Sequence, residues 1–367
     1  MINNQGKQLK TLSFVKRWDH HTQSGGYDRL ADYIDAEIFT VKELPYLRLQ
    51  ERGFTQKIMR LFMPDSHYSN HYNLKNLLAE KQIVKKVKTQ SLNLVHAFYA
   101  EDQLNRILSK RNKLKAALTG TLHLPVESHF MQRLIRADKI KRYKELDSII
   151  VLSSEMVSEI KHYTGNSEVY FVPHGIDIQS FTPPDHFKVK KDKPFHVLTV
   201  GRHARDWDTF SNVVKSLRNY SDQIKFSAVL PEKIGQSLKR KLDITTYSSI
   251  PESRLIELYH EADLLYMPLA YATANNSILE AMACGTPVIS TNTGGIPDYV
   301  NQNCGWLVPE KDVTRTSELI ISLSQNLSII KQASCEARKQ ALKFDWVKIA
   351  SQVLDVYQNA WQRWSHH

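Results

Sequence analysis

Two arginines and a glutamate in the second half of the chain are the residues best suited to hold a phosphorylated, hydroxylated ligand. Arg202 and Arg205 follow a buried apolar run, and Glu280 lies about one turn inside a helix-like segment that begins near Asn276 and Ser277. Arginine grips phosphate oxygens through paired N–H donors. A helix N-terminus also favours phosphate, and a carboxylate accepts hydrogen bonds from hydroxyl groups. These residues therefore suit a ligand with a phosphate and a neutral hydroxylated part, such as ribose.

Each of these features also has an ordinary structural explanation. Ser277 followed by Glu280 matches a capping box, in which the glutamate hydrogen-bonds back to the start of its own helix. Gly285 is a common helix terminator, and Gly294 and Gly295 are typical of a turn. A loop arginine is often simply solvated. Taken singly, the residues leave both explanations open.

Short apolar runs, separated by longer helix-like stretches, extend along the whole chain. Buried runs of this kind are typical of parallel sheets covered by helices on both faces. The sequence therefore predicts an α/β protein. The expected strands are residues 12–15, 92–98, 116–122, 148–152, 168–172, 195–200, 225–230, 262–267 and 287–290.

The length and one unusual segment predict two domains. A chain of 367 residues suggests two domains, at roughly 150 residues each. Residues 182–194 are rich in proline and charge, as linkers between domains are. We expect a first domain at 1–181, a second at 195–346, and a C-terminal helix at about 347–367. Two doubly wound domains facing a cleft would bind ligands at the carboxyl ends of their strands.

Positive charge is concentrated in the first half of the chain. There are 49 Lys and Arg against 38 Asp and Glu, a formal charge of +11, of which residues 1–180 carry +8. The basic segments are 81–88, 110–115 and 133–144. This excess indicates an anionic partner, which could be nucleic acid, an anionic membrane or a phosphorylated substrate. Nucleic acid fits least well, because no nucleic-acid motif accompanies the charge, and a solvated basic helix face is itself ordinary.

Other features bear on the compartment and on metals. Cys284, Cys304 and Cys335 have neither a zinc-binding spacing nor the number for a disulfide framework. No stretch of 18 apolar residues is present, and residues 1–10 are polar, unlike a signal peptide. We therefore expect a cytoplasmic protein, or one attached peripherally to the cytoplasmic membrane face, with no metal site.

The stretch LEAMACGTPVIST, residues 279–291, and the Gly294-Gly295 turn after it resemble the donor-site signature of glycosyltransferase family 4. Weaker similarities follow in the same order along nearly the whole chain. They are the Ser24-Gly25-Gly26 loop, the strand and helix at 149–160, the PHGID segment at 171–181, the VGR loop at 198–207 and the FDW segment at 344–346.

The resemblance implies the GT-B fold, in which two Rossmann-like domains are joined by a C-terminal helix that crosses back to the first. It implies a retaining transferase that moves a sugar from a nucleotide-diphosphate donor, with UDP or GDP expected, to a glycan, lipid-linked or small-molecule acceptor. No metal or other cofactor is implied, since cationic side chains stabilise the departing diphosphate. The second domain would bind the donor and the first the acceptor.

The resemblance also implies roles for particular residues. Arg202 and Arg205 correspond to the cationic pair that binds the diphosphate, and His123 corresponds to a strand-end histidine that faces the donor sugar. These three are the expected catalytic residues, and Glu280 would bind the ribose. The other expected donor-binding residues are Gly25, Gly26, Gly201, Asn275, Asn276 and Ser277.

One position departs from the family pattern. Two glutamates with seven residues between them are usual, and the first position is occupied here by Ala272. Asn275 or Thr273 could supply hydrogen bonds to the sugar in place of the glutamate, or the sugar could lack that contact. The departure leaves open an alternative, a non-catalytic GT-B-like protein that binds a nucleotide or a glycan.

Overall fold

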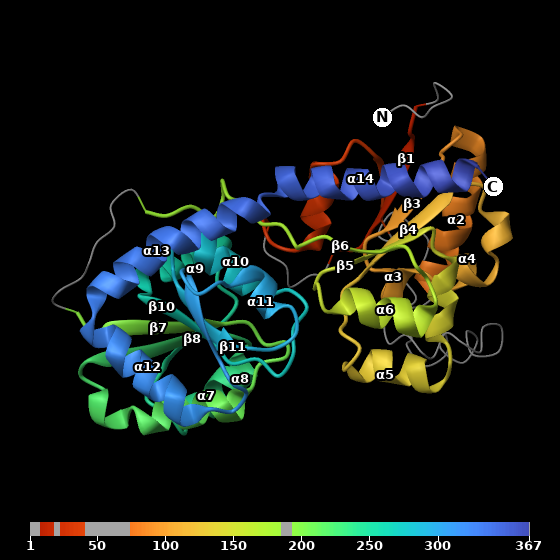
Figure 1. The fold of residues 1–367 in the computed structure, drawn as a ribbon. Coiled ribbons are helices and arrows are strands. Elements are labelled where there is room, and N and C mark those ends of the chain that lie inside the picture. Colours follow the sequence, from red (N-terminus) through yellow and green to blue (C-terminus); the bar gives the residue numbers. More distant parts are fainter. Residues whose placement is uncertain (1–7, 18–22, 41–73, 185–192, 367) are drawn as a thin grey trace. The chain divides into compact units, whose positions relative to one another are not determined.

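A computed structural model describes residues 8–17, 23–40, 74–184 and 193–366 (Figure 1). The chain divides into two compact units. Of the described residues, unit 1 contains 8–17, 26–40, 74–173 and 346–366, and unit 2 contains 23–25, 174–184 and 193–345. Each unit is therefore assembled from segments that are distant in the sequence.

Unit 1 is built on a parallel sheet of six described strands in the order β2-β1-β3-β4-β5-β6. Helices lie on both faces of this sheet (Figure 1), and β4 is buried along its whole length, as expected for a central parallel strand. The elements are β1 (Thr11–Val15), η1 (Tyr27–Asp32), β2 (Glu37–Thr40), α2 (Leu74–Gln90), β3 (Leu94–Ala97), α3 (Ala100–Gln103), α4 (Arg106–Ser109), η4 (Arg111–Lys113), β4 (Ala117–Leu122), α5 (His129–Arg136), η5 (Ile140–Glu145), β5 (Ser148–Val151), α6 (Met156–Thr164), β6 (Val169–Phe171) and α14 (Trp346–Ser365).

Unit 2 is built on a second parallel sheet of six described strands, in the order β12-β11-β10-β7-β8-β9. Its elements are β7 (Phe195–Val200), α7 (Trp207–Ser216), η6 (Arg218–Tyr220), β8 (Ile224–Val229), α8 (Glu232–Lys239), β9 (Thr245–Tyr247), α9 (Glu252–Glu261), β10 (Leu264–Met267), α10 (Asn276–Ala283), β11 (Val288–Thr291), α11 (Ile296–Tyr299), β12 (Gly305–Val308), α12 (Val313–Gln325), α13 (Leu327–Ala341) and η7 (Leu342–Phe344). Both units are thus doubly wound α/β structures, which confirms the predicted fold class.

The boundary after the first unit differs from the one expected from the sequence. Residues 174–181, which we assigned to the first domain, belong to unit 2. Phe181 is fully buried in the core of that unit, and its carbonyl accepts a hydrogen bond from Arg338 at 2.8 Å. Of the expected linker 182–194, residues 185–192 lie outside the described part of the chain.

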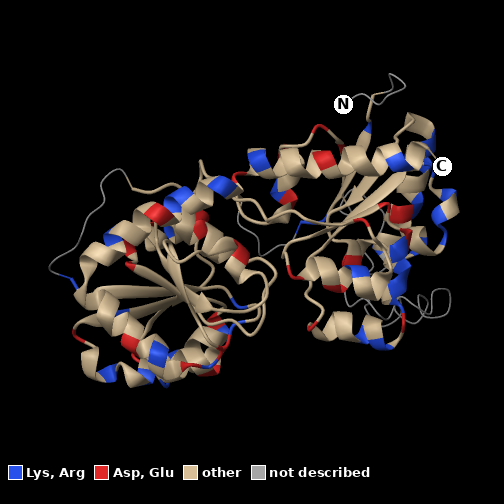
Figure 2. Ribbon diagram, viewed as in Figure 1, with Lys and Arg blue, Asp and Glu red and all other residues tan. Residues whose placement is uncertain are grey.

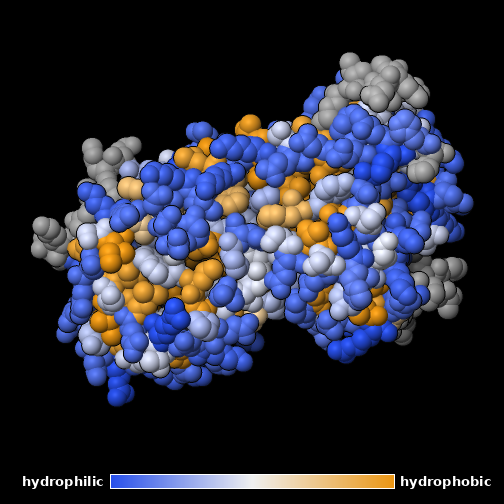
Figure 3. All heavy atoms as spheres, viewed as in Figure 1, coloured by the Kyte–Doolittle hydropathy of each residue, from blue (hydrophilic) through white to orange (hydrophobic). Residues whose placement is uncertain are grey.

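The helix α2 shows how charged and apolar residues are distributed between the surface and the core of unit 1. In α2, Ile83 and Val87 are buried whereas Lys81, Lys85 and Lys88 are exposed, so this helix has an apolar inner face and a basic outer face. Figure 2 shows further Lys and Arg on helices of unit 1, among them α5. On the face drawn in Figure 3, hydrophilic residues cover most of the surface of each unit. No described helix has the length and apolar composition needed to cross a bilayer.

The last helix, α14, belongs to unit 1, which confirms the expected return of the chain to the first domain. Its apolar residues recur at helical spacing, and Trp346, Val353, Tyr357 and Trp361 are buried. These residues cover the sheet beside β4 and β5.

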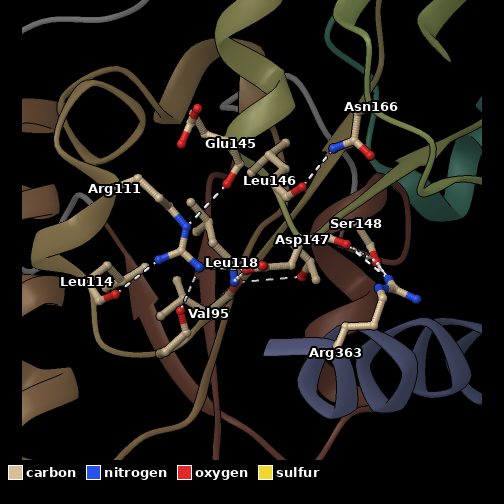
Figure 4. A network of polar contacts seen from close by, with 12 residues as sticks. Val95, Arg111, Leu114, Leu118, Glu145, Leu146, Asp147, Ser148, Asn166 and Arg363 are labelled. Carbon is tan, nitrogen blue, oxygen red and sulfur yellow. Dashed lines mark hydrogen bonds and ion pairs between the residues drawn. The ribbon is translucent and has the colours of Figure 1, made fainter. Parts of the chain in front are cut away.

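A polar network fixes the far end of α14 (Figure 4). The Arg363 guanidinium donates to the Asp147 carbonyl oxygen at 3.0 Å and to Ser148 Oγ at 2.8 Å, and it pairs with the Glu168 carboxylate at 2.7 Å. The Asp147 carboxylate in turn pairs with Arg111 at 2.6 Å. Arg363 therefore links the helix to the segment that enters β5.

Candidate functional site

The candidate site in unit 2 lies where the strand order reverses. The neighbours β7 and β10 lead to connections that run in opposite directions along the sheet, and ligands of doubly wound sheets bind outside the carboxyl ends of such strands. The loops that follow these two strands are joined by backbone hydrogen bonds, from Ala270 N to Ala204 O at 2.9 Å and from Asp206 N to Pro268 O at 3.0 Å. The two loops therefore form one rigid rim.

A third loop, after β11, is fitted closely to the same rim. Gly295 N donates to the Ala272 carbonyl oxygen at 2.9 Å. Gly294 has a φ of +49°, and a Cβ atom built there would lie 2.1 Å from that same oxygen. Only glycine fits this approach, so the Gly-Gly turn positions the Ala272 loop. Ala272 itself is buried and packs in the core of unit 2.

Arg205 is folded back onto its own loop. Its Nε and Nη2 donate to the Val200 carbonyl oxygen at 2.9 and 2.6 Å, and its Nη1 donates to the His203 carbonyl oxygen at 2.8 Å. A Cβ atom on Gly201, whose φ is +92°, would lie 2.7 Å from Arg205 Nη2 and 3.7 Å from Ser277 Oγ. Gly201, Arg205 and Ser277 are therefore neighbours. Burial lowers the pKa of Arg205 to about 10, against the opposing effect of Tyr259 and Glu280, so the group remains a cation at neutral pH.

Arg202 differs from Arg205 in being exposed. Within the described ranges it has no hydrogen-bond or ion-pair partner. His203, between the two arginines, is also exposed, and its ring meets the ring of Tyr271 edge-on at 5.9 Å. Burial, followed by the charges of Arg205 and Arg202, lowers the pKa of His203. This loop therefore exposes the Arg202 guanidinium beside a histidine whose protonated form is disfavoured.

The helix α10 begins at this rim, and its cap differs from the capping box considered above. The N-cap residue is Asn275, whose Oδ1 accepts the backbone N–H of Ile278 at 3.2 Å. Asn276 is the first residue of the helix, and Ser277 is buried. The capping-box explanation of Glu280 is therefore wrong, because another side chain caps the helix. Since Asn275 Oδ1 caps the helix, the amide nitrogen is the group that Asn275 could offer to a sugar.

Glu280 is buried and its carboxylate faces a tyrosine instead of its own helix start. Tyr259 OH donates to Glu280 Oε2 at 2.8 Å. Burial raises the pKa of Glu280 to about 7; the Tyr259 hydrogen bond and Arg205 lower it, whereas the charge of Glu252 raises it. Glu280 is thus buried beside one donor and one cation, and it is partly protonated near neutral pH.

The segment that contains Gly25 is placed in unit 2 by hydrogen bonds. Ser24 is buried, and its N–H and Oγ donate to the Glu252 carboxylate at 2.8 and 2.9 Å. Ser24 Oγ also lies 2.9 Å from Ser180 Oγ. Gly26, the next residue but one, belongs to unit 1 and has a φ of +97°.

His123 lies in unit 1, directly after β4. Its Nε2 donates to the Phe98 carbonyl oxygen at 2.7 Å, because a carbonyl can only accept. The ring is stacked on Tyr99 at 4.1 Å and meets Tyr27 edge-on at 4.7 Å. Tyr27 OH lies 3.0 Å from Thr121 Oγ1. The structure therefore brings the residue after Gly26 against His123.

Charged residues at the same end of the unit 1 sheet were not anticipated from the sequence. Lys16, after β1, pairs with Asp102 at 2.9 Å, and Glu101 accepts the backbone N–H of His123 at 2.8 Å. Burial, with Asp102 as the next cause, raises the pKa of Glu101 to about 8. These residues follow β1, β3 and β4, which are adjacent strands that include the point where the order of this sheet reverses. They therefore occupy the usual ligand-binding end of this sheet.

Comparison with known proteins identifies the second unit. Residues 194–326 match the family model described as "Glycosyl transferases group 1". The matched residues make up most of unit 2. The match contains Arg202, Arg205 and Glu280, and it confirms the recognition of a glycosyltransferase made from the sequence.

Curated relatives of the chain carry glycosyltransferase names. A D-inositol 3-phosphate glycosyltransferase of Streptomyces bingchenggensis is 25% identical over 241 residues, 58% of this chain and 53% of the relative. An MMP alpha-(1->4)-mannosyltransferase of Mycolicibacterium hassiacum is 23% identical over 228 residues, 59% of this chain and 55% of the relative. The chain spans about half the length of the curated relatives that it matches.

Solved structures show the fold. Sucrose-phosphate synthase from Thermosynechococcus elongatus aligns with a TM-score of 0.74 at 18% identity and covers 98% of this chain and 100% of that one. HepE from Anabaena, in complex with UDP-glucose, aligns with a TM-score of 0.68 at 16% identity, over 95% and 99% of the two chains. The architecture is the GT-B fold, as predicted.

The glycosyltransferase domain brings together most of the expected donor-site residues. Gly201, Arg205 and Ser277 of α10 lie together at the ends of β7 and β10, and Arg202 is in the same loop. His123 and Gly26 lie in unit 1. Tyr259 and Glu252 are the residues in the domain that the sequence did not indicate as part of a site. Helical spacing places Tyr259 on the buried face of α9, but it does not reveal the carboxylate that the tyrosine meets.

Proposed function

We propose that the protein is a glycosyltransferase that binds a nucleotide-diphosphate sugar in unit 2. One observation supports this proposal above the others: the loop after β7 carries an exposed arginine, Arg202, with no partner within the described ranges, and the neighbouring Arg205 acts on the buried carboxyl group of Glu280 in α10. Arg202 would bind the diphosphate, and Glu280 would accept hydrogen bonds from the ribose. Arg205 would add positive charge from behind its loop.

The proposed reaction proceeds with retention of configuration at the transferred sugar. The bond between the anomeric carbon and the donor phosphate oxygen breaks, and a bond to the acceptor oxygen forms on the same face. The acceptor proton passes to an oxygen of the leaving diphosphate, whose charge Arg202 and Arg205 stabilise. This route needs no protein base, and we propose that it needs no metal. UDP- and GDP-sugars are the first donors to test, and the UDP-glucose complex of the structural neighbour favours UDP.

The acceptor is proposed to bind unit 1 and to be a glycan, a lipid-linked sugar or a small molecule. Exposed basic residues on α5 and after it, Arg136, Lys141 and Lys144, suit an anionic acceptor or the anionic surface of a membrane. Such a surface would hold the protein peripherally on the cytoplasmic face. Sedimentation with vesicles that contain or lack anionic lipid tests this part of the proposal separately from catalysis.

A thermal-shift screen against nucleoside diphosphates and their sugars tests the central claim. We expect one base to stabilise the protein, because a ligand that binds only the folded state raises its melting temperature. Turnover is then measured with the selected donor and a panel of acceptors. Stabilisation without turnover or donor hydrolysis would favour the non-catalytic alternative that Ala272 motivates. Absence of any shift would contradict the proposed function.

A further inference from the structure

A glutamate of α9 binds the short segment that precedes Gly25. Glu252 Oε2 accepts the Ser24 N–H at 2.8 Å, and Oε1 accepts the Ser24 Oγ–H at 2.9 Å. The two residues are 228 positions apart in the sequence. Both oxygens of one carboxylate are therefore used to hold one residue.

The other side of Ser24 lies against Ser180. Ser180 Oγ, 2.9 Å from Ser24 Oγ, donates to Asp177 Oδ2 at 2.9 Å, and Asp177 Oδ1 accepts the Ser180 N–H at 3.0 Å. Ser24 is buried between these groups. The position of Ser24, and hence of Gly25, is determined by side chains of unit 2.

The helix that binds Ser24 also supports the candidate donor site. Glu252 is the first residue of α9, and Tyr259, seven residues later, donates to Glu280. Residues seven apart lie on the same side of a helix. The negative charge of Glu252 also raises the pKa of Glu280. One helix therefore carries both the Ser24 anchor and the partner of Glu280.

We propose that Glu252 is a positioning residue of this glycosyltransferase, which holds Ser24 so that the backbone of Gly25 is presented to the donor diphosphate. The proposal rests on the proposed function. It assigns Glu252 no contact with the reacting atoms, and it accounts for the placement of a segment from the start of the chain in unit 2. Glycine at position 25 allows the backbone to approach a ligand closely.

Two variants separate this role from a purely electrostatic one. Glu252→Ala removes both hydrogen bonds to Ser24 and the negative charge near Glu280. Glu252→Gln removes the charge alone, because its amide oxygen accepts the Ser24 N–H and its amide N–H donates to Ser24 Oγ. If Glu252 positions Ser24, Gln restores function. If it acts through charge on Glu280, Gln and Ala behave alike, and the proposal is overturned.

Hydrogen exchange on the full-length protein reports the anchor directly. We expect a peptide covering residues 23–27 to exchange faster in Glu252→Ala than in wild type, because the Ser24 amide loses its acceptor, and to keep wild-type protection in Glu252→Gln. The matched control is Glu257→Ala on the same helix, whose exposed carboxylate pairs with Arg254 at 2.7 Å. Equal exchange in all four proteins would overturn the proposal.

Binding and turnover report the functional consequence. In Glu252→Ala, affinity for the nucleoside is expected to be unchanged, because Glu280 and Tyr259 remain. Affinity for the nucleoside diphosphate and kcat/KM are expected to fall about tenfold, the loss that one hydrogen bond accounts for. Ser24→Ala keeps the backbone N–H and should lose less, and adding it to Glu252→Ala should produce no further loss. Equal losses for nucleoside and diphosphate would instead indicate general damage to the unit, against the proposal.

Measurements on the wild-type protein distinguish failure of the positioning role from failure of the proposed function. If wild type binds no nucleoside diphosphate, the proposed function fails, whereas the exchange experiment still tests the anchor. If wild type binds and turns over donor while Glu252→Ala is unaltered, the positioning role fails and the proposed function stands.

Discussion

At the residue scale, Arg202 of the proposed donor site binds the charged diphosphate, and Glu280 binds the hydroxyl groups of the ribose. Arg202 is exposed, so its cation is available to a phosphate, whereas Arg205 is bound to the carbonyl oxygens of Val200 and His203. The two arginines, which the family resemblance treats as a pair, are therefore expected to contribute differently. Arg205 shapes the loop and adds a more distant charge.

Replacing Arg202 by alanine should weaken diphosphate binding selectively. A charge-assisted hydrogen bond contributes about 1.5–3 kcal/mol, so we expect roughly a 10- to 100-fold weaker Kd for the nucleoside diphosphate and little change for the nucleoside. Isothermal calorimetry with both ligands measures the difference. Arg240→Ala, an exposed arginine at the end of α8, is the control. Equal losses for both ligands would contradict a phosphate contact.

The raised pKa of Glu280 predicts a pH dependence of stability. Burial raises this pKa from 4.5 to about 7, so between these pH values the carboxyl group is ionised in the unfolded chain but protonated in the folded one. The unfolded state binds fewer protons there, and the free energy of unfolding falls as pH rises, by at most about 1.4 kcal/mol per pH unit. Glu280→Gln should flatten this slope, as measured by urea unfolding at pH 5, 6 and 7.

Comparing the pH dependence of the unfolding free energy in wild type and in Glu280→Gln cancels the contributions of other titrating groups. Glu101, whose pKa is raised to about 8, contributes equally to wild type and variant. Gln retains an acceptor for Tyr259 OH, so the buried hydrogen bond survives the substitution. Identical slopes in the two proteins would show that Glu280 is not protonated in the folded state over this range.

At the element scale, the loops after β7, β10 and β11 are held together by backbone groups. The Ala272 carbonyl oxygen binds Gly295 N, and the Ala270 N–H binds Ala204 O. Because main-chain groups carry these contacts, side-chain substitutions at position 272 leave the rim in place. The close approach at Gly294 is the point at which the rim is sensitive to a single methyl group.

Gly294→Ala should therefore disturb the rim more than an ordinary glycine substitution does. The new Cβ would lie 2.1 Å from the Ala272 carbonyl oxygen, so we expect a loss of about 2–4 kcal/mol in unfolding free energy and weaker donor binding. Gly285→Ala is the control, because it has a φ of +80° but meets its neighbours at 3.6 Å or more; strain alone should cost about 1 kcal/mol there. Similar denaturation midpoints for the two variants would contradict the close approach.

At the scale of the whole molecule, unit 1 is completed by the last segment of the chain. Trp346 and Trp361 are buried in α14, and Tyr27 packs edge-on against Trp346 at 5.9 Å. Residues at the two ends of the sequence thus share one core. The helix α14 therefore contributes to the stability of unit 1.

Removal of α14 by truncation after Asp345 should destabilise unit 1 and spare unit 2. We expect faster hydrogen exchange in β4 and β5, which the helix covers, and wild-type exchange in β7 and β10. Val347→Ala, at a residue of the same helix that is 62% exposed, serves as the control for a neutral change. Uniformly faster exchange in both units would contradict the assignment of α14 to unit 1 alone.

Local pattern predicted the central strands because those strands are buried on both sides. The expected runs at 116–122 and 195–200 correspond to β4 (Ala117–Leu122) and β7 (Phe195–Val200). The strands that were missed, β2, β9 and β12, lie at sheet edges and are partly exposed. These three strands have only three or four residues each, so any apolar run in them is too short to stand out from a loop, whereas the edge strand β6 lies in the apolar run at 168–172 and was predicted.

The sequence by itself determined the α/β class, the two sheets and the return of the last helix, and it indicated Arg202 and Glu280 as candidates for a donor site. Each of these depends on residues close together in the chain or on a recognisable run. Tertiary structure alone decided that Arg205 binds its own loop, that Tyr259 binds Glu280 and that Glu252 binds Ser24. The physical reason is that buried polar groups must find partners wherever packing places them, and packing brings together residues that no local pattern connects.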